Sequence, residues 1–285
     1  MNNILIIFPS WEERSTLGFQ RDIENCQNLN KVLIFRFQKS AHPNEIDKNI
    51  AEIKYICLSK NIISEEITIP NIEVDKWRKL ENFAQHLDDK TNIYIDITTM
   101  PRSVIWALFF FFKQKYKQTT VIYHKPKEYS KEWLSKDPDI PQLLFKHSGI
   151  IEFGKPTTLF VLAGFDEDRV IQLVNYYEPQ NVIVGECNQR KTFKYGAVNL
   201  EIIDIDEYNE EWGYDIIENK IKTILETSNL IIASLGPKTG AISVYRCFMK
   251  YPQIALSYVP CKEFNIDYCK GISDTLIKEI KFSIT

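Results

Sequence analysis

The sequence predicts an α/β protein of two tandem Rossmann-like units, each with a mainly parallel sheet flanked by helices. Short continuous runs of β-prone apolar residues alternate with amphipathic stretches, the pattern of parallel strands that helices cover on both faces. The order of strands, helices and turns in the first half then recurs in the second half. The length of 285 residues is sufficient for two domains of ordinary size.

The first unit is predicted over residues 1–130. Its strands are short apolar runs, and the stretches between them have helical periodicity. The expected strands are 4–8, 32–35, 93–97 and 119–123, and the expected helices are 16–26, 75–87 and 104–112. The last helix is apolar on all sides, so we expect it to lie in the core or at an interface such as a homodimer contact.

The second unit is predicted over residues 158–285. The segment 131–157 has several prolines and no sustained apolar period, so it is predicted to be a linker with a hairpin or a short helix. The expected strands of the second unit are 159–163, 182–184, 230–234 and 254–258, and its expected helices are 169–177, 214–225 and 238–248.

Turns recur in the same order as the strands and helices. The matched pairs are Trp11–Arg14 with Phe165–Arg169, Met100–Ser103 with Gly236–Thr239, and Pro126–Tyr129 with Pro260–Phe264. Three matched turns in one order predict that the chain is a duplication of one unit.

The composition narrows the classes of function. A net charge of -3 gives no global attraction to nucleic acid or membrane, so a polyanion must be met by a local cluster. The longest apolar run, 104–112, is too short to span a bilayer, and the first residues do not resemble a signal peptide, so a cytoplasmic location is expected. Six scattered cysteines and four histidines form no zinc pattern, and neither a metal nor another cofactor is expected.

Candidate ligand-binding residues follow the strands, because open α/β sheets bind ligands at the carboxyl ends of their strands. In the Pro-Arg and Pro-Lys turns, proline favours the first helical turn, and the free backbone N–H groups there suit a phosphate. A solvated, well-capped helix start is the alternative interpretation. The candidates are Trp11, Arg14, Thr98, Thr99, Arg102, Arg169, Ser234, Gly236 and Lys238.

Four residues are candidates for catalysis: Glu12, Glu13, Asp96 and Arg102. Asp96 ends a buried strand, where an unpaired carboxylate is costly, so it is expected to orient the turn, pair with a basic residue or act as a general base. Glu12 and Glu13 are either a water-activating base or acids that favour the start of a helix. The position that matches Asp96 is Ile232, so the two halves are not chemically equivalent.

The run Asp96–Arg102, followed by an apolar helix, resembles the CARF family of Rossmann-like sensor domains. That family has an Asp-Ile/Leu-Thr-x-x-x-Lys-Pro turn after its fourth strand, and Leu235–Lys238 is a variant of the same turn. The order of the last two residues is reversed here, and Met100 stands at a small-residue position. The resemblance implies binding of a cyclic oligonucleotide messenger in prokaryotic defence, with two fused units as in the related SAVED domain.

Three functions remain open from the sequence. The first is a nucleotide-sensing or nucleotide-handling protein of prokaryotic antiviral defence, which binds a nucleotide or cyclic oligonucleotide in a cleft between the two units. The second is a metal-independent hydrolase of a nucleotide phosphodiester or an N-glycosidic bond. The third is a scaffold subunit that docks a co-encoded effector protein through the 104–112 helix or its neighbours.

Overall fold

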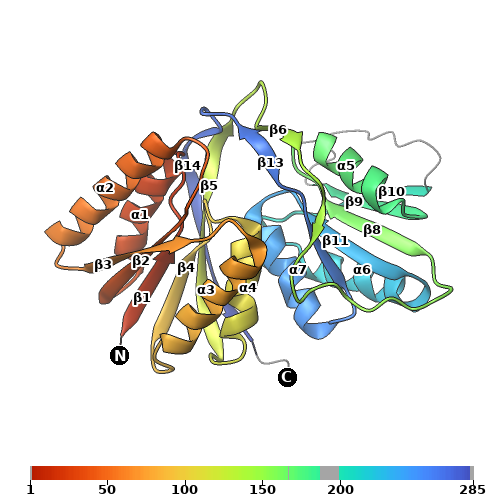
Figure 1. Ribbon diagram of the computed structural model, residues 1–285, viewed down its shortest axis with the longest axis horizontal. Helices are drawn as coiled ribbons and strands as arrows, with labels where there is room; N and C mark the ends of the chain where they lie inside the picture. The colour runs from red at the N-terminus through yellow and green to blue at the C-terminus, as the bar shows by residue number, and fades with distance from the viewer. Residues whose placement is uncertain (1, 166, 187–198, 283–285) are drawn as a thin grey trace. The chain divides into compact units, whose positions relative to one another are not determined.

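The computed structural model describes residues 2–165, 167–186 and 199–282, so Asp166 of the predicted Phe165–Arg169 turn and Cys187 lie outside the described residues. It confirms the predicted α/β class. Two six-stranded, mainly parallel sheets are flanked by seven helices within those ranges (Figure 1). Contacts divide the chain into one unit of residues 1–132 and 265–285 and another of residues 133–264.

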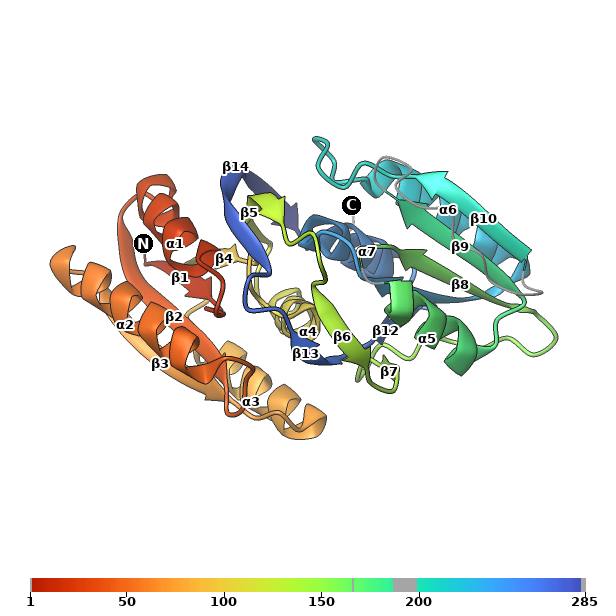
Figure 2. The ribbon, with the colours of Figure 1, turned by 90° about the horizontal axis from the view of Figure 1, so that it is seen from above.

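The sheet of the first unit has the order β14-β5-β4-β1-β2-β3. Its strands are β1 (Asn3–Ile7), β2 (Leu29–Phe37), β3 (Ile63–Ile69), β4 (Asn92–Asp96), β5 (Gln118–Tyr129) and β14 (Cys269–Lys281). All of these pairs are parallel except β14 with β5. The chain therefore begins and ends in this unit, and Figure 2 shows β14 beside β5.

Helices cover both faces of the first sheet. They are α1 (Arg14–Asn25), α2 (Pro43–Ser59), α3 (Glu73–His86) and α4 (Arg102–Phe112). On one face, Val32 and Ile34 of β2 share a buried cluster with residues of α1 and α2. On the other face, Phe35 meets Phe83 of α3 with ring centroids 5.0 Å apart. This alternation of side chains along β2 is what allows one strand to be buried on both faces.

The apolar helix predicted over 104–112 is α4, and it belongs to the core. Its residues from Ser103 to Phe109, with Phe111 and Phe112, are buried. Trp77 of α3 packs edge-on against Phe111, and Phe109 packs edge-on against Phe282 near the end of the chain. Of the two locations expected from its sequence, the core is therefore the observed one.

The second unit repeats the strand order of the first. Its sheet is ordered β10-β9-β8-β11-β12-β7, in which only β7 is antiparallel to its neighbour. The elements are β6 (Ser135–Pro138), β7 (Gln142–Leu143), β8 (Thr157–Leu162), α5 (Glu167–Tyr177), β9 (Asn181–Glu186), β10 (Asn199–Asp204), α6 (Tyr214–Thr227), β11 (Asn229–Ser234), α7 (Lys238–Lys250), β12 (Ala255–Tyr258) and β13 (Cys261–Phe264). β6 and β13 form a separate two-stranded ribbon. An origin by duplication stays a prediction.

Candidate functional site

The candidate site of the first unit is the turn between β4 and α4. Asp96 ends β4, and its Oδ1 accepts a hydrogen bond of 2.7 Å from the backbone N–H of Thr98. The Thr99 hydroxyl donates to the backbone carbonyl of Phe8, just beyond β1, at 2.6 Å. Pro101 is extended, with φ -62° and ψ 140°, and α4 begins at Arg102. Two neighbouring strands thus hold the turn at the carboxyl end of the sheet.

Basic side chains lie at the start of α4. Lys76 of α3 is buried, and its Nζ donates to the hydroxyl of Ser103 at 3.2 Å. The same Nζ pairs with Glu73 at 2.5 Å. Arg102, the first residue of α4, is half-buried. The first turn of a helix carries partial positive charge, and Arg102 adds a formal charge, so this edge favours an anion even though Glu73 balances the charge of Lys76.

A buried polar cluster lies behind the turn. It consists of Asp22 of α1, Asp96 of β4 and His124 of β5. One carboxylate oxygen of each aspartate and one imidazole nitrogen of His124 all lie within 4.8 Å of one another. His124 Nε2 is 2.9 Å from Asp22 Oδ1, and its Nδ1 is 2.9 Å from the hydroxyl of Thr275 on β14. The backbone N–H of His124 donates to the hydroxyl of Thr98 at 2.9 Å. The cluster therefore joins α1, β5 and β14 to the turn between β4 and α4.

Burial shifts the protonation of this cluster. Burial, and then the charge of Asp96, raises the pKa of Asp22 from 3.8 to about 7. Burial alone would lower the pKa of His124, but the hydrogen bond with Asp22 and the charge of Asp96 outweigh it and raise this pKa above 6.5. In the part of the chain that the structure describes, Asp22 Oδ2 is buried without a hydrogen-bond partner.

The same three residues are also the candidates for a metal ion. Imidazole nitrogen and carboxylate oxygen are common ligands of Zn²⁺ and related cations. In the structure, His124 Nε2 and Asp22 Oδ1 form a hydrogen bond with each other. The expectation from the sequence that no metal is bound stays a prediction.

Glu12 and Arg14 face each other inside the protein. Arg14 Nη2 lies 2.6 Å from Glu12 Oε2, and the two side chains are 2% and 7% exposed, respectively. Arg14 also donates to the backbone carbonyl of His124 at 2.8 Å, and the thiol of Cys269 donates to Glu12 at 2.9 Å. Glu13 is exposed and accepts a hydrogen bond from the backbone of Gly271. The ion pair thus closes the loop after β1 against β5 and β14.

Two further predicted binding residues make internal contacts. The indole Nε1 of Trp11 donates to the backbone carbonyl of Asn265 at 3.0 Å, and its ring lies 6.3 Å from that of Tyr268. Arg169 of α5 is buried and donates to the backbone carbonyl of Val259. Trp11 and Arg169 were predicted to bind a ligand. In the structure, each of them makes a contact that holds a loop or helix of its own unit in place.

The matching turn of the second unit has a different chemical character. Ser234 ends β11 and is 2% exposed, Gly236 follows it, and Lys238 begins α7. The carboxylate of Glu207 lies against this turn, since a Cβ added to Gly236 would lie 2.6 Å from Glu207 Oε2. An acidic side chain therefore lies against the turn of the second unit. Sequence patterns could not identify Glu207, because no short-range pattern connects it to the turn.

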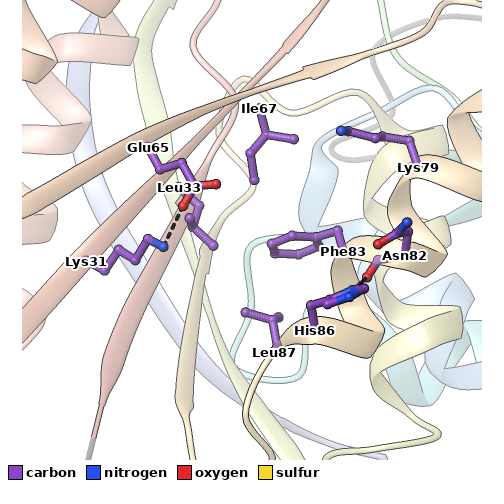
Figure 3. Close-up of a pocket in the computed structure, with 9 residues that line it drawn as sticks. All are labelled: Lys31, Leu33, Glu65, Ile67, Lys79, Asn82, Phe83, His86 and Leu87. Carbon is purple, nitrogen blue, oxygen red and sulfur yellow. Dashed lines mark hydrogen bonds and ion pairs between the residues drawn. The ribbon is translucent and has the colours of Figure 1, made fainter.

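A cavity of about 300 Å³ lies elsewhere in the first unit, between β2, β3 and α3 (Figure 3). Apolar side chains line much of it, and an ion pair of 2.5 Å between Lys31 and Glu65 lies at its side. The lining residues are Lys31, Leu33, Glu65, Ile67, Lys79, Asn82, Phe83, His86 and Leu87. None of the candidates predicted from the sequence belongs to this set.

Sequence comparisons do not assign the chain to a family: no family model matches it, and no curated protein matches it. Among solved structures, the chain is similar to a type III CRISPR defence DNA nuclease activated by cyclic oligoadenylate. The TM-score is 0.58 at 6% identity, over 86% of this chain and 64% of the nuclease. This chain thus shares its fold with the nuclease and spans less than two thirds of its length.

A second solved structure, the cytoplasmic domain of a prokaryotic cation chloride cotransporter, gives a TM-score of 0.31 at 8% identity, over 93% of this chain and 98% of that one. So low a score supports no conclusion about fold or function. In the part of the chain that the structure describes, no helix is both long and apolar enough to cross a membrane.

Proposed function

We propose that the protein senses a nucleotide in prokaryotic defence, and that it binds a cyclic oligonucleotide at the turn between β4 and α4. The observation that carries this proposal is the fold shared with a nuclease that cyclic oligoadenylate activates. The Asp96–Arg102 turn, which resembles that of CARF sensors, lies at the carboxyl end of the sheet, where open α/β sheets bind ligands.

The charges around this turn support an anionic ligand. The whole chain has a net charge of -3, so attraction to phosphate must come from a local cluster. At α4 the positive groups are Arg102, the positive end of the helix dipole and Lys76, whose charge Glu73 balances. The hydroxyl of Ser103 lies beside Lys76 and adds a polar group at the same place.

A ligand screen by thermal unfolding tests this proposal. The wild-type protein is heated with cyclic oligoadenylates of several ring sizes, with linear oligoadenylate and with ATP. A ligand that binds only the folded state at a hundred times its Kd stabilises it by about 2.7 kcal/mol, so Tm should rise with the concentration of a cyclic oligoadenylate. The absence of a shift with every ring size at saturating concentration would refute the proposal.

The hydrolase alternative requires a base among Glu12, Glu13 and Asp96. Glu12 is held in the ion pair with Arg14, and Asp96 is buried and accepts the hydrogen bond from Thr98, which leaves Glu13 as the exposed carboxylate. We therefore favour binding over hydrolysis. Chromatography of a cyclic oligoadenylate after incubation with the protein should recover the ligand intact, whereas linear products would favour the hydrolase.

The scaffold alternative finds less support in the 104–112 helix, because α4 is covered within its own unit. A co-encoded effector protein and a homodimer stay predictions. A sensor that binds its ligand without cleaving it would transmit the binding to such a partner.

A further inference from the structure

The first turn of α7 encloses a carboxylate from the chain itself. Glu207 is 1% exposed, although it follows β10 and precedes α6 in a connecting segment. Its Oε2 would lie 2.6 Å from a Cβ at Gly236, and its Oε1 would collide with a Cβ at Gly240. The carboxylate therefore occupies the space that the missing side chains of two glycines leave at the start of the helix.

The first unit fills the matching space with apolar side chains. Aligning Pro101 with Pro237 places Met100 opposite Gly236, and Val104 opposite Gly240. Met100 and Val104 are both fully buried. The two turns thus share a backbone plan, but only the second has the glycines that admit an anion against the helix. The dipole of α7 favours a negative charge at this position, which offsets part of the cost of burying the carboxylate.

The segment that carries Glu207 is fastened on both sides. Ile205 is buried and would contact a Cβ at Gly185 of β9 at 2.6 Å. At the other end, the hydroxyl of Ser243 on α7 donates to the backbone carbonyl of Trp212 at 2.8 Å. Residues 205–213, here called the strap, thus hold Glu207 between an anchor on the sheet and an anchor on α7.

Two hydroxyls of this turn point to a polar ligand. Ser234, at the end of β11, and Thr239, in the first turn of α7, are 2% and 0% exposed. In the described part of the chain, neither Ser234 Oγ nor Thr239 Oγ1 has a hydrogen-bond partner. Buried hydroxyls rarely lack a partner, so their presence on both sides of Pro237 suits a site that can take a multivalent acceptor such as a phosphate.

We propose that the first turn of α7 is an anion-binding position for phosphate groups, and that Glu207 occupies it as an internal competitor. A phosphate-bearing ligand would bind the second unit only when the strap withdraws Glu207, so the contact is autoinhibitory. This site lies in the second unit and does not depend on nucleotide binding at α4 of the first unit.

The test removes the internal carboxylate and supplies inorganic phosphate as the probe. The wild type, Glu207→Ala and Glu201→Ala are melted in chloride and in phosphate buffers of equal pH and ionic strength. Glu201 is a matched control, because it is a carboxylate on β10 that pairs with Lys220 and is 51% exposed. In chloride, Glu207→Ala should lower Tm by roughly 4 °C, and Glu201→Ala by less than about 1 °C.

The decisive comparison is between the Tm in phosphate and the Tm in chloride. Phosphate should restore at least half of the Tm lost in Glu207→Ala, and it should leave the Tm of the wild type and of Glu201→Ala nearly unchanged. Equal phosphate shifts in the wild type and Glu207→Ala would overturn the proposal, since they would place the anion elsewhere or show that Glu207 only fills space. If Glu207→Ala does not fold in chloride, Glu207→Ser is tested in the same way. Failure of both variants to fold even in phosphate would also refute the competitor role.

Discussion

The imidazole of His124 packs against Gly18 of α1, where a Cβ would lie 2.6 Å from its Cδ2. Gly18 and Asp22 are one helical turn apart and so lie on the same face of α1. The close approach at Gly18 thereby brings the Asp22 carboxylate to hydrogen-bond distance of His124 Nε2. This contact ties α1 to the polar cluster behind the turn between β4 and α4.

Gly18→Ala should destabilise the first unit despite the higher helix propensity of alanine. The added methyl group must displace the His124 ring, and overpacking of this kind costs about 1–3 kcal/mol, which exceeds the gain of up to about 1 kcal/mol from helix propensity. Urea unfolding measures the difference, with Gln20→Ala on an exposed position of the same helix as the control. A Gly18→Ala variant as stable as the control would show that the ring is not tightly seated.

Asp22→Asn should reduce the dependence of stability on pH. Because the folded pKa of Asp22 is about 7 instead of 3.8, its contribution to stability is greatest at low pH and falls as the pH rises to about 7. The raised pKa of His124 acts in the same direction, since its contribution is complete below pH 6.5 and lost above its folded pKa.

Asparagine at position 22 would imitate the protonated carboxyl at every pH. The unfolding free energy of the variant relative to the wild type should therefore increase from about pH 5 to about pH 8, by roughly 1 kcal/mol or more. Urea titrations at several pH values give the two curves. Parallel curves would contradict the raised pKa of Asp22 in the folded protein.

Glu12→Gln should lower stability because it leaves the buried charge of Arg14 without its partner. Breaking a buried ion pair costs about 3–5 kcal/mol, whereas replacing both partners with apolar residues costs less. The double variant Glu12→Leu/Arg14→Met should accordingly be more stable than Glu12→Gln in urea unfolding. The opposite order would contradict the claim that Glu12→Gln leaves a costly unpaired charge on Arg14.

Removal of residues 265–285 should unfold the first unit selectively. These residues include β14, the Thr275 partner of His124 and the Asn265 carbonyl that accepts from Trp11. Hydrogen exchange followed by mass spectrometry should show loss of protection in β5 and β4, with β8 and β11 still protected. Unchanged protection of β5 would show that β14 is dispensable.

The sequence was sufficient to predict most of the strands that form the centres of the two sheets. β1, β4, β8 and β11 are continuous apolar runs because both of their faces are covered. The edge strands β3 and β10 were missed, since half-exposed strands carry charged residues and lose that pattern. Helix α2 was also missed, although its buried residues 46, 50, 53 and 57 follow a helical period.

The candidate site was predictable only where its signals are local. Proline, threonine and a basic residue mark the 98–102 turn within a few positions of one another. The partnership of Asp22 with His124 spans 102 residues and depends on how α1 packs on the sheet. The contact of Glu207 with Gly236 and Gly240 likewise depends on the path of the strap. Pairings of this kind are set by tertiary packing, which local patterns do not encode.

Calorimetric titration of a cyclic oligoadenylate into wild type, Arg102→Ala and Arg78→Ala tests the central claim most directly. Arg78 is a matched control on α3, because its side chain is 75% exposed and pairs with Asp75. Loss of a charge-assisted hydrogen bond costs about 1.5–3 kcal/mol, so Arg102→Ala should weaken binding by roughly 10- to 100-fold, and Arg78→Ala should not. Equal affinity of all three proteins would contradict a nucleotide site at the start of α4.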